Sequence, residues 1–112
     1  MDLNNWQTQL RKGLLDIVVM NLLKNTRRHG YDMVQALKQI EGLTIREGNI
    51  YPILARLQID GLVTSDFEPS LEGPPRKYFT LTKSGQKTLT EMNTHLDQII
   101  ESIQNIRKGQ IL

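Results

Sequence analysis

The sequence predicts a mainly α-helical fold that carries one small β-hairpin. Apolar residues recur at three- and four-residue steps over most of the chain, which is the period of a helix. The segment from Leu62 to Thr82 differs, because runs of β-branched and aromatic residues flank a stretch with Pro and Gly, as in a hairpin. Aromatic residues make up only 5% of the chain, which disfavours a large β-sandwich.

Length and composition indicate one soluble, folded domain. The chain has 112 residues, 38% hydrophobic and 23% charged, enough for one modest core. There is no cysteine, which excludes disulfides and thiolate metal sites and favours a reducing compartment. Arg11-Lys12 followed by an apolar run resembles a secretory signal, but Asp16 and Asn21 interrupt the run, and it is too short to span a membrane. We therefore expect a cytoplasmic protein without a membrane partner.

The first helix is expected over about residues 4–24. Leu10, Leu14, Ile17 and Val18 mark one stripe, but further apolar residues spread almost all round the helix. A helix that is apolar all round must be covered on more than one side, so this one indicates a partner chain.

The segment after the first helix predicts a turn at "TRRHGYD" and then a second helix over about 31–40. Val34, Leu37 and Ile40 would point inward, and Gly42 is a plausible stop. Residues 43–45 are expected to form a short extended piece.

The third helix is expected over about 47–60, with Gly48 at its start and Pro52 in its body. Both residues are poor in helix interiors, by about 1 and roughly 3 kcal/mol. A start near Glu47 makes Pro52 less costly, because the hydrogen bond it forfeits is then the one to Gly48, at the helix edge. Thr44 and Glu47 have capping-box spacing, so an earlier start stays open, and it would make Pro52 kink the helix.

The hairpin is expected to have a long tip containing Pro69, Gly73, Pro74 and Pro75. Thr82 then caps a last helix over about 83–108. That helix has apolar residues at alternating steps of three and four, a heptad seam formed by Leu89, Met92, Leu96, Ile99, Ile103 and Ile106.

Such a seam can pack on the chain's own core or on another chain. We favour a homodimer formed by the seam together with Leu14 and Val18. The seam follows a complete small domain, and the first helix has more apolar surface than that domain can cover. The chain is therefore divided into a domain at 1–82 and a dimerisation helix at 83–112.

Helix, helix, short strand, helix and hairpin is the order of a winged helix-turn-helix. In that architecture the third helix can enter the major groove of DNA and the hairpin can contact the flanking backbone. Winged helices also serve as protein-binding modules without DNA, so that alternative stays open.

Enzyme chemistry finds little support. His29 and His95 belong to no spaced ligand set and are expected at the surface, and phosphate-loop and nucleophile-elbow motifs are absent. We expect no cofactor and no metal.

DNA binding finds more support, because residues of the types that contact DNA gather on the predicted third helix and hairpin. At the start of the third helix we expect Arg46, Asn49 and Tyr51 to lie close together, able to contact guanine, adenine and phosphate respectively. The further candidates for phosphate contacts are Arg56, Arg76, Lys77 and Lys83. Each alone could equally be a solvated surface residue, but the set favours DNA. Charge is also asymmetric: residues 76–87 hold four basic residues and no acidic one, whereas 57–75 hold four acidic residues and no basic one.

The blocks "HGYDMVQAL", "EGNIYPILARLQIDGLV" and "GPPRKYFTLTKSGQKTL" resemble, in order and spacing, the signature blocks of the PadR family of bacterial transcriptional regulators. The resemblance covers about Leu10 to Leu89, and the single long helix after the hairpin is similar to the family's short subgroup. It implies a dimeric winged-helix repressor on an inverted-repeat operator, and some members are released by small aromatic compounds. The DNA-contacting positions that it implies are Tyr31, Gly48, Asn49, Tyr51, Arg76 and Lys77.

Two positions depart from the family pattern. Many members have Thr where this chain has Asn49, and Ser or Pro is frequent at Arg46. Operator preference is therefore not transferable from relatives at these positions.

Trp6 is the candidate for a ligand site. It lies on the first helix, which we expect at the dimer interface, where apolar surfaces can leave a cavity for an aromatic molecule. The favoured alternative is that Trp6 is an ordinary interface anchor.

Overall fold

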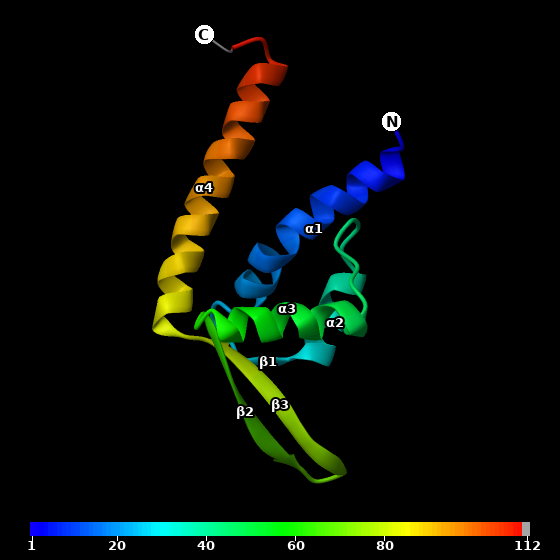
Figure 1. The fold of residues 1–112 in the computed structure, drawn as a ribbon, viewed down its shortest axis with the longest axis vertical. Coiled ribbons are helices and arrows are strands. Elements are labelled where there is room, and N and C mark those ends of the chain that lie inside the picture. Colours follow the sequence, from blue (N-terminus) through cyan, green and yellow to red (C-terminus); the bar gives the residue numbers. More distant parts are fainter. Residues whose placement is uncertain (111–112) are drawn as a thin grey trace.

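The structure is a computed structural model and describes residues 1–110. Over these residues the chain forms four helices and a three-stranded antiparallel sheet of order β1-β3-β2. The elements are α1 Leu3–Leu22, β1 Arg28–His29, α2 Gly30–Lys38, α3 Glu47–Ile59, β2 Val63–Ser70, β3 Gly73–Leu81 and α4 Lys83–Arg107. Figure 1 shows α1 and α4 diverging from one side of α2 and α3, with the β2–β3 hairpin on the other side. The predicted fold class is confirmed, and so is the order of the four helices and the hairpin.

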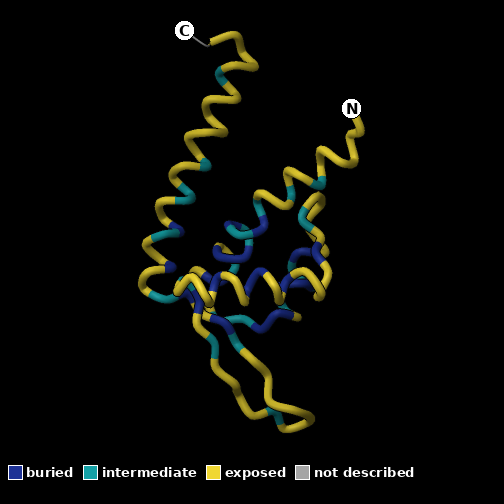
Figure 2. The backbone as a smooth tube through the Cα atoms, viewed as in Figure 1, coloured by how far each residue is buried: buried dark blue, intermediate teal, exposed yellow. Residues whose placement is uncertain are grey.

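The hydrophobic core lies where the second half of α1, the helices α2 and α3, the base of the hairpin and the start of α4 meet. Figure 2 shows the buried residues gathered there, while the far ends of α1 and α4 and the hairpin tip are exposed. The largest side chains that are almost fully buried are Met20, Leu23, Met33, Leu37, Ile50, Leu54 and Leu89. None of the helices in residues 1–110 is long and apolar enough to cross a membrane.

The helix α3 begins at Glu47, as predicted, and runs without interruption through Pro52 to Ile59. Its N-cap is Arg46, whose side chain makes no capping hydrogen bond, so the earlier start at a Thr44 capping box is wrong. Pro52 therefore lies in the second turn and forfeits only the bond to Gly48, and α3 is drawn without a visible kink in Figure 1.

The second helix ends earlier than predicted. It stops at Lys38, with Gln39 as its C-cap, and Gly42 follows in a left-handed conformation with φ of 86°. Ile40 consequently lies in the turn and is 45% exposed, so its expected inward position is wrong.

The third strand of the sheet is not where the sequence placed it. Residues 43–45 form no strand, although Ile45 is buried in the core. The segment expected as a turn instead contains β1, in which Arg28 pairs with Phe79 and His29 with Tyr78 of β3. A two-residue strand has too little periodicity to be recognised, and its partner lies about fifty residues away in the chain.

The hairpin is longer than predicted, and its long loop does not exist. Only Leu71 and Glu72 separate the strands, because the register continues to Ser70 opposite Gly73. Between the pairs Glu68–Arg76 and Ser70–Gly73, the single residue Pro69 of β2 faces Pro74 and Pro75 of β3. The prolines, which cannot donate ladder hydrogen bonds, thus gather at a bulge instead of ending the strands.

The side chain of Thr82 connects the base of the hairpin to the start of α4. The Thr82 hydroxyl donates to the Gly61 carbonyl at 2.7 Å and accepts the Gly85 N–H at 2.9 Å, which confirms Thr82 as the cap of α4. A Cβ at Gly85 would overlap the Leu62 carbonyl oxygen. This packing explains why the sequence requires Gly at this position.

The heptad seam of α4 divides into two parts. Leu89 is 1% exposed and belongs to the chain's own core. For this residue, packing on the chain's own core was the alternative to packing on a second chain. Four further dimerisation candidates are half-buried against that core: Leu14, Val18, Met92 and Leu96. The remaining three, Ile99, Ile103 and Ile106, are between 43% and 60% exposed. Of the predicted dimerisation segment 83–112, residues 111–112 lie outside the described part of the chain.

Candidate nucleic-acid interface

The exposed side of α3 is a ridge of mostly small residues. Ile50, Leu54 and Leu57 point into the core. On the opposite side, at steps of three and four, lie the exposed residues Gly48, Pro52, Ala55 and Ile59. A Cβ at Gly48 would meet no atom within 4 Å, so the start of this ridge is open to solvent. The ridge lets another surface approach the helix backbone closely.

The predicted trio of Arg46, Asn49 and Tyr51 is split between the two flanks of this ridge. Asn49 and Tyr51 are two positions apart, which is about 200° around a helix. Arg46 and Asn49 border a cavity on the side of α1, whereas Tyr51 borders a different cavity on the side of the hairpin. The expectation that the three lie close together is therefore wrong.

On the hairpin side, residues from α2, α3 and β3 converge around a cavity of about 300 Å³. We call this group the wing-side cluster: His29, Tyr31, Tyr51, Pro75, Arg76 and Lys77. Tyr31 is 52% and Tyr51 44% exposed, so both phenol rings are accessible. The tertiary structure thus brings three sequence-predicted DNA candidates, Tyr31, Tyr51 and Arg76, to one place, and Lys77 borders the same cavity with its ammonium directed to the other face of β3.

Close packing holds the Tyr51 ring in this cluster. A Cβ built on Gly30, the first residue of α2, would lie 2.7 Å from Cε1 of Tyr51. The Gly-Tyr pair at the start of α2 and the Tyr-Pro pair in α3 are therefore parts of one contact. The absence of a side chain at Gly30 makes room for the ring.

His29 was expected at the surface, and that expectation is wrong. It is 9% exposed and forms the N-cap of α2, with Nδ1 accepting the Asp32 N–H at 3.2 Å. Its Nε2 lies 3.0 Å from the Asp32 carboxylate and 3.2 Å from Nη1 of Arg76. His29 thus links the start of α2 to the hairpin. His95 is exposed, as predicted.

Arg76 and Lys77 point to opposite faces of β3, because adjacent strand residues alternate. Arg76 is at the edge of the His29 ring, whereas the Lys77 ammonium lies 5.9 Å from the Phe67 ring centre and 5.6 Å from that of Phe79. Both remain exposed. The two cations can therefore reach different points of a ligand that spans the hairpin.

The acidic residues of the hairpin have a partner that sequence reasoning missed. Arg27, from the segment before β1, pairs with both Asp66 and Glu68 of β2. Its guanidinium also lies 4.2 Å from the centre of the Tyr78 ring. Two of the four acidic residues in 57–75 are thus paired with one arginine within the fold, while the basic residues of 76–87 are exposed.

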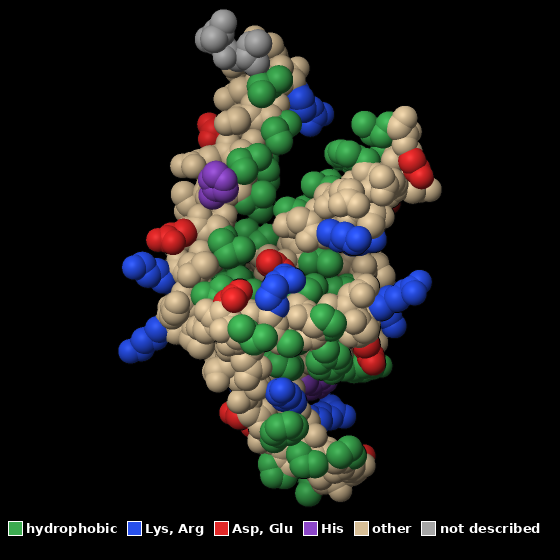
Figure 3. Space-filling model, viewed as in Figure 1, with side chains coloured by type: hydrophobic (Ala, Val, Ile, Leu, Met, Phe, Trp, Pro, Cys, Tyr) green, Lys and Arg blue, Asp and Glu red, His purple; other side chains and the backbone are tan. Residues whose placement is uncertain are grey.

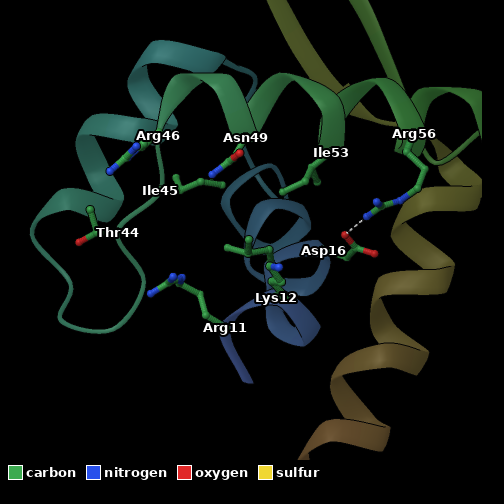
Figure 4. Close-up of a pocket in the computed structure, with 10 residues that line it drawn as sticks. Arg11, Lys12, Asp16, Thr44, Ile45, Arg46, Asn49, Ile53 and Arg56 are labelled. Atoms are coloured by element: carbon green, nitrogen blue, oxygen red, sulfur yellow. Dashed lines mark hydrogen bonds and ion pairs between the residues drawn. The ribbon is translucent and has the colours of Figure 1, made fainter. Parts of the chain in front are cut away.

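On the other flank, α1 and α3 enclose an open cleft of about 560 Å³, which we call the α1-side cleft (Figure 4). Its floor is apolar, formed by Leu15, Ile45 and Ile53. Its charged and amide residues are Arg11, Lys12, Asp16, Arg46, Asn49 and Arg56. Figure 3 shows basic side chains spread over the middle of the molecule, where α3 lies in Figure 1, with acidic and hydrophobic side chains between them.

Arg56 has an ion-pair partner in this cleft. Its guanidinium donates to the carboxylate of Asp16 on α1, so this phosphate-contact candidate already has an acidic partner in the free protein. Lys83, the first residue of α4, is exposed but lines neither the wing-side cavity nor the α1-side cleft. The structure therefore does not bring Lys83 together with the other candidates.

Comparison with known proteins identifies this arrangement. Residues 19–91 match the model of the transcriptional regulator PadR-like family. The chain belongs to the PadR-like family. This is a family of transcriptional regulators and not of enzymes, in agreement with the expectation from the sequence.

Solved PadR structures share the fold over most of the chain. A PadR-like transcription factor from Bacteroides fragilis is 36% identical, with a TM-score of 0.77 over 91% of this chain and 98% of its own. Bacillus subtilis PadR, solved in complex with operator DNA, is 27% identical, with a TM-score of 0.65 over 70% of this chain and 46% of its own. A transcriptional regulator of Mycobacterium tuberculosis is 24% identical over 85% of this chain and 87% of its own length.

Proposed function

We propose that this PadR-family chain is a sequence-specific DNA-binding repressor that acts as a homodimer on an inverted-repeat operator. The observation that carries the proposal is the exposed small-residue ridge of α3 bordered by the wing-side cluster. The ridge fits a helix that enters a major groove, and the cluster supplies phenols and cations for the adjacent backbone. The related Bacillus subtilis PadR was solved in complex with operator DNA, which supports DNA binding by this chain. Such a regulator would act in the cytoplasm, where the bacterial chromosome lies.

The main test measures, by fluorescence anisotropy, the binding of the purified protein to the DNA upstream of its own gene. Random DNA of equal length serves as the comparison. We expect a clear preference for the upstream DNA and a steep loss of affinity with added salt, because each phosphate contact releases counterions. Equal affinity for both DNAs would contradict the proposal and favour a protein-interaction winged helix. A promoter-reporter fusion then distinguishes repression from activation.

The homodimer proposal rests on exposed apolar residues of the two diverging helices α1 and α4, which we call the arms. Ile99, Ile103 and Ile106 of α4 are exposed at heptad spacing, and Trp6 and Leu10 of α1 are 49% and 48% exposed. A second copy offers matching surfaces by symmetry. We expect Ile103→Asp to produce monomers in analytical ultracentrifugation. The matched control is Leu71→Asp at the hairpin tip, whose native side chain is exposed and lies outside both arms; it should stay dimeric.

We further propose that a small aromatic effector releases the protein from DNA by binding near Trp6. The half-exposed indole on an arm assigned to the dimer interface supports this proposal. Trp6 is the only tryptophan in the sequence, so its emission reports binding directly. A panel of phenolic acids, drugs and dyes that leaves the emission and the DNA affinity unchanged would remove the support.

A further inference from the structure

We infer that the DNA-binding surface extends beyond α3 and the hairpin onto α1, where Arg11 and Lys12 contact the sugar–phosphate backbone on the flank of α3 that faces away from the hairpin. This inference rests on the proposed function and adds a second point of backbone contact to it. The family resemblance covers both residues, but the DNA-contacting positions that it implies include neither of them.

The first step is the position of the two side chains. Arg11 and Lys12 line the α1-side cleft together with Arg46 and Asn49 of the α3 start. Figure 4 shows Arg11 and Lys12 on α1 across the cleft from α3, with Asn49 directed toward it. Lys12 is exposed and Arg11 half-buried, so both heads can reach a ligand at the mouth of the cleft.

The second step is the charge of the cleft. Four cations and one carboxylate border it, and the carboxylate, Asp16, is paired with Arg56. Among residues 1–110, the ion pairs involve neither Arg11 nor Lys12 nor Arg46. Three like charges are thus gathered around one opening without an acidic partner. This arrangement attracts an anion to the mouth of the cleft.

The third step is the width of the groove. A helix with its side chains is about 10–12 Å across, and the major groove of B-DNA is about 12 Å wide. A helix lying in that groove therefore has a phosphate strand on each flank. The wing-side cluster borders one flank of the ridge, and the α1-side cleft borders the other. The DNA strand along the second flank would therefore lie next to Arg11 and Lys12 of α1.

The test compares the salt dependence of operator binding for three proteins. The double variant Arg11→Gln/Lys12→Gln should lower the slope of log affinity against log salt by about 1 to 2, because each lost phosphate contact removes roughly 0.9 from it. The matched control, Lys24→Gln/Lys108→Gln, loses the same charge at positions outside both clusters and should keep the wild-type slope.

Phosphate ethylation interference gives a second, positional measurement. Wild-type protein should be sensitive to ethylation on both strands that border the groove occupied by α3. The Arg11→Gln/Lys12→Gln variant should lose sensitivity only on the strand away from the hairpin, and Arg76→Gln/Lys77→Gln only on the strand beside it.

An unchanged slope in the α1 double variant, with wild-type protein still preferring its operator, would overturn this inference and leave the proposed function intact. A slope loss equal to that of the control, or an affinity loss of the same size at every salt concentration, would also overturn it. Failure of the wild-type protein to prefer upstream DNA would instead overturn the proposed function and this inference together.

Discussion

The two flanks of α3 differ in how they are built. On the wing side, rings and backbone are packed closely: Tyr51 fills the space beside Gly30, and the nearly buried His29 connects α2 to the hairpin. On the α1 side, the cleft is open, and flexible cations border it around a single ion pair. The wing side therefore fixes geometry, whereas the α1 side supplies charge. Substitutions that change the size of a side chain should affect DNA binding mainly on the wing side. Substitutions that change its charge should affect DNA binding mainly on the α1 side.

The largest effect is expected for Gly30→Ala on the wing side. The new methyl group would lie 2.7 Å from the far end of the Tyr51 side chain, which is 44% exposed, so the ring must turn away from its place in the wing-side cluster. We expect clearly weaker operator binding in fluorescence anisotropy because the ring is displaced, with little change in melting temperature because the ring can move into solvent. Gly13→Ala is the matched control, since nothing lies within 4 Å of its added methyl. Operator affinity that is equal in both variants would contradict a role of the Gly30–Tyr51 contact in DNA binding.

Asn49→Ala addresses base reading at the α1-side edge of the ridge. If the amide contacts an adenine in bidentate fashion, its loss should reduce affinity for the operator by about 1–3 kcal/mol and relax specificity at one or two base pairs. Lys77→Ala on the wing side should instead weaken binding similarly on all sequences. Binding measured on a set of operators with single base-pair changes separates the two. Losses of equal size on operator and random DNA for both variants would refute this division.

Gly48→Ala tests the ridge between the two flanks. The added methyl meets no atom of the chain, and Ala is favoured over Gly in a helix by about 1 kcal/mol, so unfolding in urea should require a higher concentration. Operator affinity should fall nonetheless, because the methyl group stands between the helix backbone and the DNA. A variant that is more stable and binds DNA as tightly as wild type would show that the ridge does not approach DNA closely.

The smallest effect on stability is expected for Asp16→Asn in the α1-side cleft. The side chains of Arg56 and Asp16 are 55% and 40% exposed, and such surface pairs contribute only about 0.2–1 kcal/mol. Operator affinity should increase at low salt, because Arg56 loses its charged partner and the cleft becomes more positive. Glu91→Gln on α4 makes the same change in net charge outside the cleft and serves as the control. Equal affinity gains for both variants would assign the effect to net charge alone.

Local signals in the sequence were sufficient for the existence of the helices and for the starts of α3 and α4, although not for the end of α2. The start of α3 at Glu47 follows from the cost of Pro52, and the start of α4 follows from Thr82, whose hydroxyl caps the third amide beyond it. The exposed part of the α4 seam, from Ile99 onward, also followed from spacing. Such features depend on residues within one or two helical turns, so the chain itself displays them.

The site was only partly visible in the sequence. The motif blocks pointed to Tyr31, Tyr51, Arg76 and Lys77, and the fold gathers these residues around one cavity. The sequence did not indicate that His29 is buried, or that Arg27 pairs with the acidic strand. A partial signal for His29 was available, because it precedes the helix and is followed three positions later by Asp32.

The sequence by itself determined the family, the order of the helices and the hairpin, and the residue types available for contact with DNA. Only the tertiary structure decided that Arg28–His29 forms the third strand, that the prolines of the hairpin share a bulge, and that Asn49 and Tyr51 border different cavities. The physical reason is the range of the interactions. Helix caps and periodicity involve neighbours in the chain, whereas strand pairing and the two flanks of α3 depend on partners that are distant in sequence and meet only when the core is packed.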